Sequence, residues 1–466
     1  MSSNEQYLQS IGQKGKVMSK EEMTFDSYYA KAMENPQLAR NAVQRVYDMI
    51  MSYGTYEDEK GKIHYNFFRG RMFGAEKQIA QIMDYFKAAS MGLDIKKRIL
   101  FFLGPPGGGK SMFLSFIKKG LADYSKNEKG AMYKIQGCPI NEDPLHLIED
   151  EDTRKEIWER YGVKIEGKLC PFCKHKLDYD WKNNISHVKV ERFFVDEDSR
   201  NGIGTFAPAE ENDMSELWGA PNLRRVEEIG NEADPRAYDF NGELHKANRG
   251  IMEFIEVLKA DAAFLHILLT LAEEREFKTP RFPLQFVDEC LIAHTNEGEF
   301  YRFIAVKENE AIVDRLYIVQ MPYNMSYKYE EMIYHSALKT KLVVKGVKVH
   351  PGAVRLASIF AISTRYSTNN DKLRDGMQGI SPRFILNALA ISLVRTSSDT
   401  VTPLDMYATL YDQVERYPVL DVDTRIKYLK ILDELKETIE EFNKVSDSDI
   451  KLDKVINNRT KLFDRI

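Results

Sequence analysis

The sequence has few cysteines and no long hydrophobic run. Four cysteines occur among 466 residues. That is too few for a disulfide scaffold, so we expect a reducing compartment. No apolar run approaches the ~20 residues that span a bilayer, and residues 1–6 lack the basic and apolar regions of a signal peptide. These absences predict a cytoplasmic protein that does not act in a membrane.

An excess of positive charge is also absent. The formal net charge is −5, which provides no overall attraction to nucleic acid or to an acidic membrane surface. No basic helix of the kind that follows a nucleic-acid groove is evident. We therefore expect a protein substrate rather than a nucleic acid or a membrane.

The catalytic loops of protein kinases are missing as well. The sequence contains neither H-R-D nor D-F-G, and Gly202-Ile203-Gly204 falls short of the G-x-G-x-x-G nucleotide loop. A phosphoryl-transfer activity would therefore need another kind of nucleotide site.

Such a site is present as a complete P-loop, G-x-x-x-x-G-K-[ST]. Its positions are filled by Gly104, Pro105, Pro106, Gly107, Gly108, Gly109, Lys110 and Ser111. The glycines let successive backbone N–H groups close around phosphate oxygens. Lys110 would reach the β- and γ-phosphates of ATP, and the Ser111 hydroxyl would bind Mg²⁺. An apolar strand at 99–103 precedes the loop and a helical pattern follows it, which together form an anion site.

The remaining patterns predict an α/β fold around this loop. Strand and helix signals alternate after residue 250, which indicates a parallel sheet with helices on both faces. We expect an N-terminal helical segment at 1–60 and a P-loop ATPase core at 61–335 with an insertion at about 137–245. A helical lid at 336–395 and the truncated start of a helical C-terminal domain at 396–466 would follow.

The strand after the insertion resembles the metal-binding strand of AAA+ ATPases, in which a glycine precedes an apolar run that ends in Asp-Glu. Here Ile255 stands where the aspartate is usual, and Glu256 stands where the glutamate activates water. Glu253 is the nearest other acid that could serve Mg²⁺. Either glutamate could instead be a solvated charge at a strand edge. The resemblance leaves the catalytic acid open between Glu256 and Glu253.

Three further residues resemble AAA+ catalytic groups. Asn296 follows an apolar strand and would position the attacking water, although a turn-forming asparagine is the alternative. Arg315 lies in a segment like the one that presents an arginine finger to a neighbouring subunit, and an exposed structural arginine is equally compatible. Arg383, at a predicted helix start, would reach back toward the phosphates. A finger that acts in trans implies a homo-oligomeric ring.

The chain as a whole resembles the PrkA family of bacterial proteins over about residues 29–393. The strings that carry the resemblance are residues 73–76, 88–93, 104–111, 144–147, 201–206, 247–250 and 364–365. The resemblance implies an AAA+ domain that binds ATP and phosphorylates itself or a protein substrate in stress signalling. An ATP-driven remodelling or proteolysis-linked ring without kinase activity is the alternative, since only ATP hydrolysis follows from the motifs.

Two weaker signals lie in the insertion. Cys170 and Cys173 have the C-x-x-C spacing of half a zinc site, with His175, His187 and Cys138 nearby. A Zn²⁺ ion or a reduced turn with two ordinary thiols would explain the pair. Residues 201–206 are predicted to form a tight glycine-rich turn, with a mobile loop lining a ring pore as the alternative.

Overall fold

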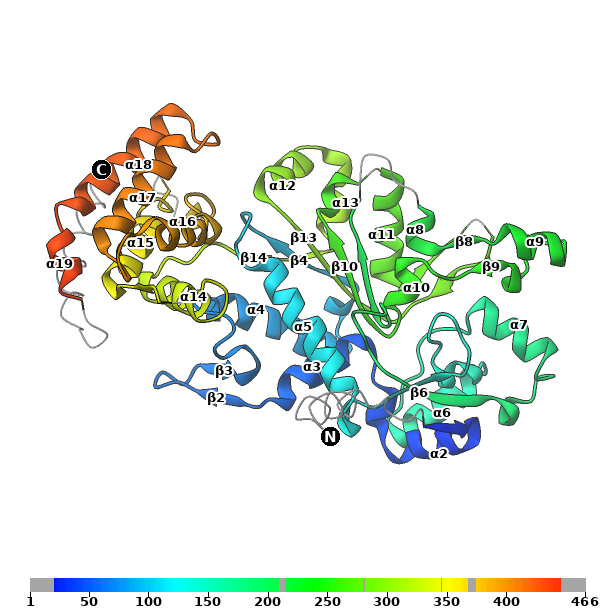
Figure 1. Cartoon of the computed structure of the whole chain (residues 1–466). Coiled ribbons are helices and arrows are strands. Elements are labelled where there is room, and N and C mark those ends of the chain that lie inside the picture. Colours follow the sequence, from blue (N-terminus) through cyan, green and yellow to red (C-terminus); the bar gives the residue numbers. More distant parts are fainter. Residues whose placement is uncertain are drawn as a thin grey trace, which may run out of the picture. The chain divides into compact units, whose positions relative to one another are not determined.

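The computed structural model describes residues 21–208, 214–260, 262–279, 281–344, 346–367 and 374–445 (Figure 1). The chain forms two compact units. Unit 1 comprises Met1–Ser52, Phe86–Ile99 and Phe116–Ala293, and unit 2 comprises Tyr53–Tyr85, Leu100–Ser115 and His294–Ile466. The predicted domain boundaries are not tested by this division and stay a prediction.

A parallel sheet carries the predicted α/β core. Its five strands have the order β14-β4-β13-β10-β7. Their bounds are Ile99–Leu103 (β4), Ile203–Phe206 (β7), Gly250–Ile255 (β10), Glu289–Thr295 (β13) and Leu316–Gln320 (β14). Strands β10 and β7 pair in parallel, with Ile251 opposite Ile203. Every residue of β4 is buried, as expected for a strand covered on both faces. The predicted fold class and the strand before the P-loop are confirmed.

The prediction of a turn or pore loop at residues 201–206 is wrong. Ile203–Phe206 form the strand β7, whose apolar side chains are buried. Gly204 is required there by close packing, because an added Cβ would lie 2.4 Å from the carbonyl oxygen of Glu243. Glycine therefore signals close backbone approach within a strand at this position, and not a turn.

In unit 1 the N-terminal segment packs with the insertion. Strands β1 (Glu22–Thr24), β6 (Lys189–Phe193) and β5 (Met132–Ile135) form an antiparallel sheet in that order. Helices α2 (Phe25–Glu34), α6 (Glu151–Tyr161) and α7 (Pro171–Tyr179) contribute to one hydrophobic cluster beside it. The N-caps Thr24, Asp150 and Cys170 each accept a backbone hydrogen bond where these helices begin.

The remaining α-helices and strands of unit 1 comprise two longer helices and several short elements. They are α3 (Ala42–Ser52), α8 (Ser215–Trp218), β8 (Ala220–Pro221), α9 (Leu223–Ile229), β9 (Tyr238–Asp239), α10 (Glu243–Ala247), α11 (Ala262–Glu274), β11 (Glu276–Phe277) and β12 (Gln285–Phe286). Helix α3 buries an apolar face, because Val43, Val46 and Ile50 are all buried.

Unit 2 contains the P-loop and a helical region. Its elements outside the sheet are β2 (Thr55–Glu57), β3 (Ile63–Tyr65), α12 (Glu297–Ile304), α13 (Glu310–Val313), α14 (Tyr327–Thr340), β15 (Lys348–Val349), α15 (Pro351–Ser363), α16 (Pro382–Arg395), β16 (Thr400–Val401), α17 (Pro403–Arg416), α18 (Val422–Lys436) and α19 (Ile439–Asn443). Helices α4 (Glu76–Ser90) and α5 (Lys110–Ser125) each divide between the two units.

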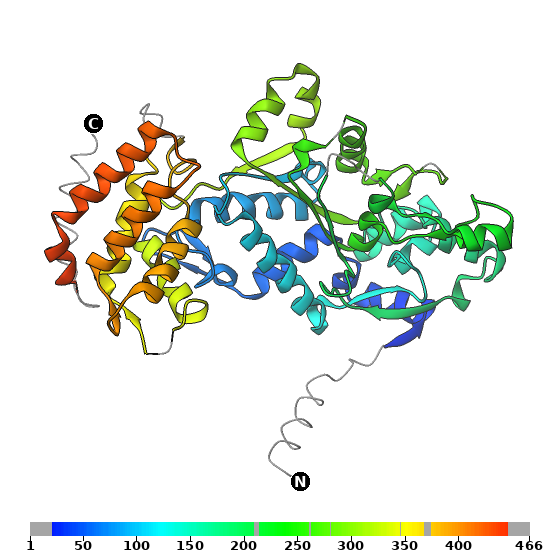
Figure 2. The same ribbon diagram turned by 45° about the horizontal axis from the view of Figure 1, so that its top comes forward.

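Helices α14 to α19 lie side by side, coloured yellow to red in Figure 2. A hydrophobic cluster of buried side chains holds them together. Its fully buried members include Phe360, Leu389, Leu410 and Leu432. One buried ion pair accompanies them, because Arg365 donates to the Glu330 carboxylate at 2.6 Å with both side chains 0% exposed. Removing one partner of such a pair would leave a charge without compensation, so the pair fixes α14 against the end of α15.

Candidate nucleotide-binding site

The P-loop joins β4 to α5 and takes a shape that only glycine permits at several positions. Gly107 and Gly109 have φ values of +86° and +92°, which L side chains rarely adopt. A Cβ added to Gly104 would lie 2.2 Å from the carbonyl oxygen of Met321, and one on Gly108 would lie 2.6 Å from it. The loop backbone thus passes directly against the residue that follows β14.

Lys110 and Ser111 begin helix α5. The Lys110 ammonium donates to the carbonyl oxygens of Gly104 at 2.6 Å and Pro105 at 2.9 Å, so the side chain folds back over the loop. Ser111 is exposed in the first helical turn. A helix N-terminus with a lysine over the loop and an exposed hydroxyl suits a phosphate group with its metal ion.

Arg383 lies beside the P-loop within unit 2. It is the second residue of α16, whose N-cap is Ser381. Its Cγ, Cδ and Nε atoms stand 3.7–3.8 Å from the point where a Cβ on Gly107 would be. Tyr323 also contacts the loop, since its hydroxyl donates to the Pro106 carbonyl at 2.7 Å. Burial raises the pKa of Tyr323 to about 12, so this donor stays protonated at neutral pH.

Asn296 and Arg315 lie in the same unit as the P-loop. Asn296 follows Thr295, whose carbonyl accepts from the Gly104 backbone N–H at 3.4 Å. The Asn296 side chain caps α12 by accepting from the Glu299 backbone N–H at 3.0 Å. Arg315 follows α13 and donates to the Ala311 carbonyl at 2.7 Å. Both residues therefore also have local structural contacts, and their catalytic roles stay predictions.

Glu253 and Glu256 belong to unit 1 and have different surroundings. Glu253 is buried within β10, and its carboxylate accepts from the Lys118 ammonium at 2.5 Å. Lys118 also donates to the Thr205 hydroxyl at 3.0 Å. Glu256 comes directly after β10 in the left-handed conformation, with φ 49° and ψ 41°, and forms an ion pair with Lys259 on the surface. A non-glycine residue in this conformation is strained by about 1–3 kcal/mol, which is common at functional sites.

The structure also contains a pocket that the sequence did not suggest. It lies in unit 2 and is lined by Tyr56, Ile63, His64, Tyr65, Phe68, Arg69, Met72, Glu76, Ile79 and Ala80. The Met72 side chain comes within 3.9 Å of the position of a Cβ on Gly109, so the pocket adjoins the P-loop. Aromatic and apolar side chains next to a phosphate site suit a nucleotide base, and His64, Arg69 and Glu76 add polar atoms to the walls. Only the density of aromatic residues between 53 and 73 could have indicated it.

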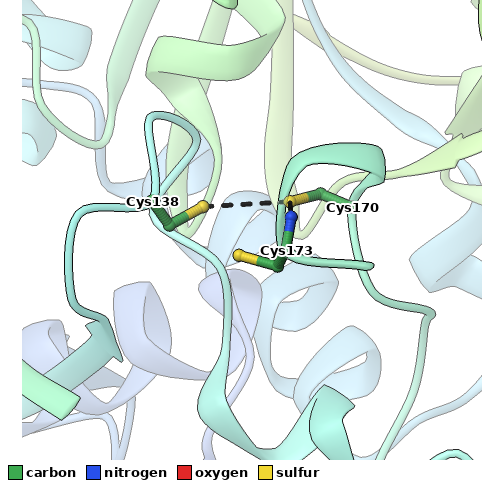
Figure 3. Close-up of side chains that lie close together, drawn as sticks. All are labelled: Cys138, Cys170 and Cys173. Atoms are coloured by element: carbon green, nitrogen blue, oxygen red, sulfur yellow. Dashed lines mark hydrogen bonds between the residues drawn. The ribbon is translucent and has the colours of Figure 1, made fainter. Parts of the chain in front are cut away.

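Three cysteines come together in unit 1. Cys170 and Cys173 of the predicted pair are joined by Cys138, and the three sulfur atoms lie within 4.8 Å of one another (Figure 3). All three side chains are buried and free of disulfides. Of the residues that the structure describes, this is the cluster that could hold a metal through thiolates.

Helices long and apolar enough to cross a bilayer are not found within the described ranges.

Comparisons with known proteins agree with the site. A family model described as the PrkA AAA domain matches residues 23–372. A second, described as the PrkA serine protein kinase C-terminal domain, matches residues 347–451.

Two relatives carry different names. The chain is 37% identical over 457 residues to a Bacillus subtilis protein named ATP-dependent protease PrkA, covering 91% of this chain and 72% of that protein. It is 28% identical over 442 residues to an Escherichia coli protein named serine/threonine kinase YeaG, covering 85% of this chain and 65% of that protein. The chain thus spans about two thirds of the length of the Escherichia coli relative.

A solved structure of NtrX from Brucella abortus in complex with ATP is a distant likeness. It has 12% sequence identity and a TM-score of 0.40 over 84% of this chain and 69% of that one. The family is decided by the extent of the model match and by the 37% identity: this chain belongs to the PrkA family and carries its AAA domain.

Proposed function

We propose that this protein hydrolyses ATP with Mg²⁺ and couples the reaction to the remodelling of a protein substrate. The complete P-loop, with Arg383 packed against Gly107, is the observation that carries this proposal. The loop and Lys110 would bind the phosphates, and Ser111 would bind Mg²⁺. The pocket from Tyr56 to Ala80 would receive the base.

The other catalytic roles follow the same proposal. Glu256 would activate the attacking water, with Glu253 as the alternative acid. Asn296 would orient that water, and Arg315 would act on the site of a neighbouring subunit in a homo-oligomeric ring. ATP and Mg²⁺ are the cofactors. A Zn²⁺ ion at Cys170 and Cys173 would be structural and would take no part in the reaction. The free thiols of all four cysteines support a reducing, cytoplasmic setting.

Phosphorylation of a protein substrate, or of the protein itself, in stress signalling is the second candidate function. The name of the Escherichia coli relative favours it. Two observations favour remodelling or proteolysis-linked work instead. The relative with the higher identity is named a protease, and the chain lacks the H-R-D and D-F-G loops of protein kinases.

The fate of the γ-phosphate distinguishes the two candidates. The full chain is incubated with Mg²⁺, γ-phosphate-labelled ATP and a generic unfolded protein, and free phosphate and protein-bound label are both measured. We expect the label in free phosphate, with turnover stimulated by the unfolded protein. Label that stays on serine or threonine at a rate matching ATP consumption would establish the kinase alternative and refute the remodelling proposal.

Replacing Lys110 by alanine tests the nucleotide site itself. Each hydrogen bond to a charged group contributes about 1.5–3 kcal/mol, so we expect ATP affinity to fall about 10- to 150-fold for each hydrogen bond between Lys110 and a phosphate oxygen. Equilibrium binding of a fluorescent ATP analogue measures the change. Lys119→Ala is the matched control, because Lys119 is an exposed lysine of the same helix. Unchanged affinity in a folded Lys110→Ala variant would remove the P-loop assignment.

A further inference from the structure

The three-cysteine cluster of unit 1 is assembled from two segments that are distant in sequence. Cys138 lies in the turn after β5, whereas Cys170 is the N-cap of α7 and Cys173 lies in its first turn. Figure 3 shows the three sulfur atoms directed toward a common point. Their exposed fractions are 3%, 3% and 0%, so the site is closed to solvent. A closed site is typical of a structural metal.

The sulfur spacing matches a tetrahedral metal. The Cys138 and Cys170 sulfur atoms are 3.8 Å apart. Two thiolates bound to one tetrahedral zinc at about 2.3 Å each would lie about 3.8 Å apart. A disulfide would require a separation of about 2.05 Å. The observed distance therefore suits a shared ion better than an oxidised pair.

Hydrogen bonds in the surroundings orient the sulfur atoms. The Cys173 backbone N–H donates to the Cys170 sulfur at 3.3 Å. The Glu142 carboxylate accepts from the Cys170 backbone N–H at 2.6 Å, and its other oxygen contacts His146 Nδ1 at 2.6 Å. Bonds of this kind hold the ligand side chains in place around a metal.

His245 is available as a fourth donor. It is 0% exposed, and its Nδ1 atom has no hydrogen-bond partner among the residues that the structure describes. Its Nε2 atom lies 3.3 Å from the Gln285 side-chain oxygen. That contact assigns the proton to Nε2 and leaves the Nδ1 lone pair open. His245 lies outside the group of sulfur atoms within 4.8 Å, so coordination requires its side chain to move toward the ion.

Aromatic contacts link His245 to the buried cluster that contains the cysteines. The His245 ring packs edge-on against Phe240 at 5.2 Å between centroids, and Phe240 in turn contacts Phe172 of α7. The imidazole therefore belongs to the same buried cluster as the cysteines.

We propose that Cys138, Cys170 and Cys173 bind one structural Zn²⁺ ion, with His245 Nδ1 as the fourth ligand. Three thiolates and one imidazole are a donor set that zinc prefers in closed sites. The ion would cross-link the turn after β5 to the start of α7, and it would do so independently of the P-loop. We therefore expect a variant that loses zinc to keep nucleotide binding, and a variant that loses nucleotide binding to keep zinc.

Metal analysis of the purified full chain tests the site. We expect about one zinc per chain, and Cys170→Ser should lose it. Cys290→Ser is the matched control, since Cys290 is also buried but lies in β13 outside the cluster. Burial raises the pKa of the Cys290 thiol to about 12, so it should behave as an inert thiol. His245→Gln should weaken zinc binding at least about 10–100-fold.

Cobalt substitution covers the case in which a cysteine variant fails to fold. The wild-type protein, stripped of zinc and reconstituted with Co²⁺, should show thiolate-to-cobalt charge-transfer absorption and tetrahedral visible bands. A protein that holds no zinc and yields no such spectrum would overturn the site. So would iron in place of zinc, or equal zinc loss in Cys290→Ser and Cys170→Ser. Unchanged zinc affinity in His245→Gln would remove His245 from the ligand set.

Discussion

Replacing Arg315 by alanine is expected to lower the ATP hydrolysis rate by about 10³–10⁵, because a trans-acting arginine stabilises the charge of the transition state by that factor. ATP binding should be preserved, since the residue would contact the nucleotide of a neighbouring subunit. Steady-state phosphate release, together with ATP binding on the same preparation, measures both quantities. In the structure Arg315 donates to the Ala311 backbone carbonyl, and a hydrogen bond from a charged group contributes only about 1.5–3 kcal/mol, so the variant should still fold.

Mixing variants shows whether Arg315 acts in trans. Chains carrying Arg315→Ala keep an intact P-loop, and chains carrying Lys110→Ala keep an intact arginine. Mixed assemblies should therefore recover part of the activity that each variant lacks alone. Arg302→Ala serves as the control, because Arg302 is an exposed arginine of α12 that pairs with Glu299. Full activity of Arg315→Ala, or no recovery on mixing, would contradict the finger assignment.

Replacing Glu256 by glutamine is expected to slow hydrolysis by about 10²–10⁴, the contribution of a positioned general base. Glutamine keeps the shape of glutamate but cannot accept a proton as a carboxylate does. ATP and Mg²⁺ should stay bound, and single-turnover kinetics would show the loss in the chemical step. Glu256 has a left-handed backbone conformation, and its ion pair with Lys259 is exposed. Packing in the core therefore does not explain why Glu256 holds this strained conformation.

Glu253→Gln is compared with Glu256→Gln, because it tests the alternative catalytic acid. The Glu253 carboxylate neutralises the buried Lys118, so its loss should lower thermal stability, as expected for one partner of a buried pair. A changed Mg²⁺ dependence would indicate that Glu253 has taken the role of the aspartate that Ile255 replaces. Normal hydrolysis in Glu256→Gln combined with a dead Glu253→Gln would show that Glu253 is the catalytic acid.

Local sequence patterns determined the nucleotide loop, the strand before it and the family. The run at Ile99–Leu103 is apolar throughout and the P-loop glycines all lie within residues 104–109, so near neighbours in the chain carry the whole signal. The same holds for α3, whose apolar period matches its buried face. Apolar periodicity and glycine spacing reflect the local backbone geometry and the exposure of each side chain, so they can be recognised from the sequence alone.

The tertiary structure decided what distant segments build together. It placed Gly204 within the strand β7, where the residue packs closely against the Glu243 backbone. It brought Cys138 to Cys170 across 32 residues and set Arg383 against Gly107. Spacing along the chain does not encode such contacts. They follow from the folded path of the backbone, which brings segments distant in sequence into contact.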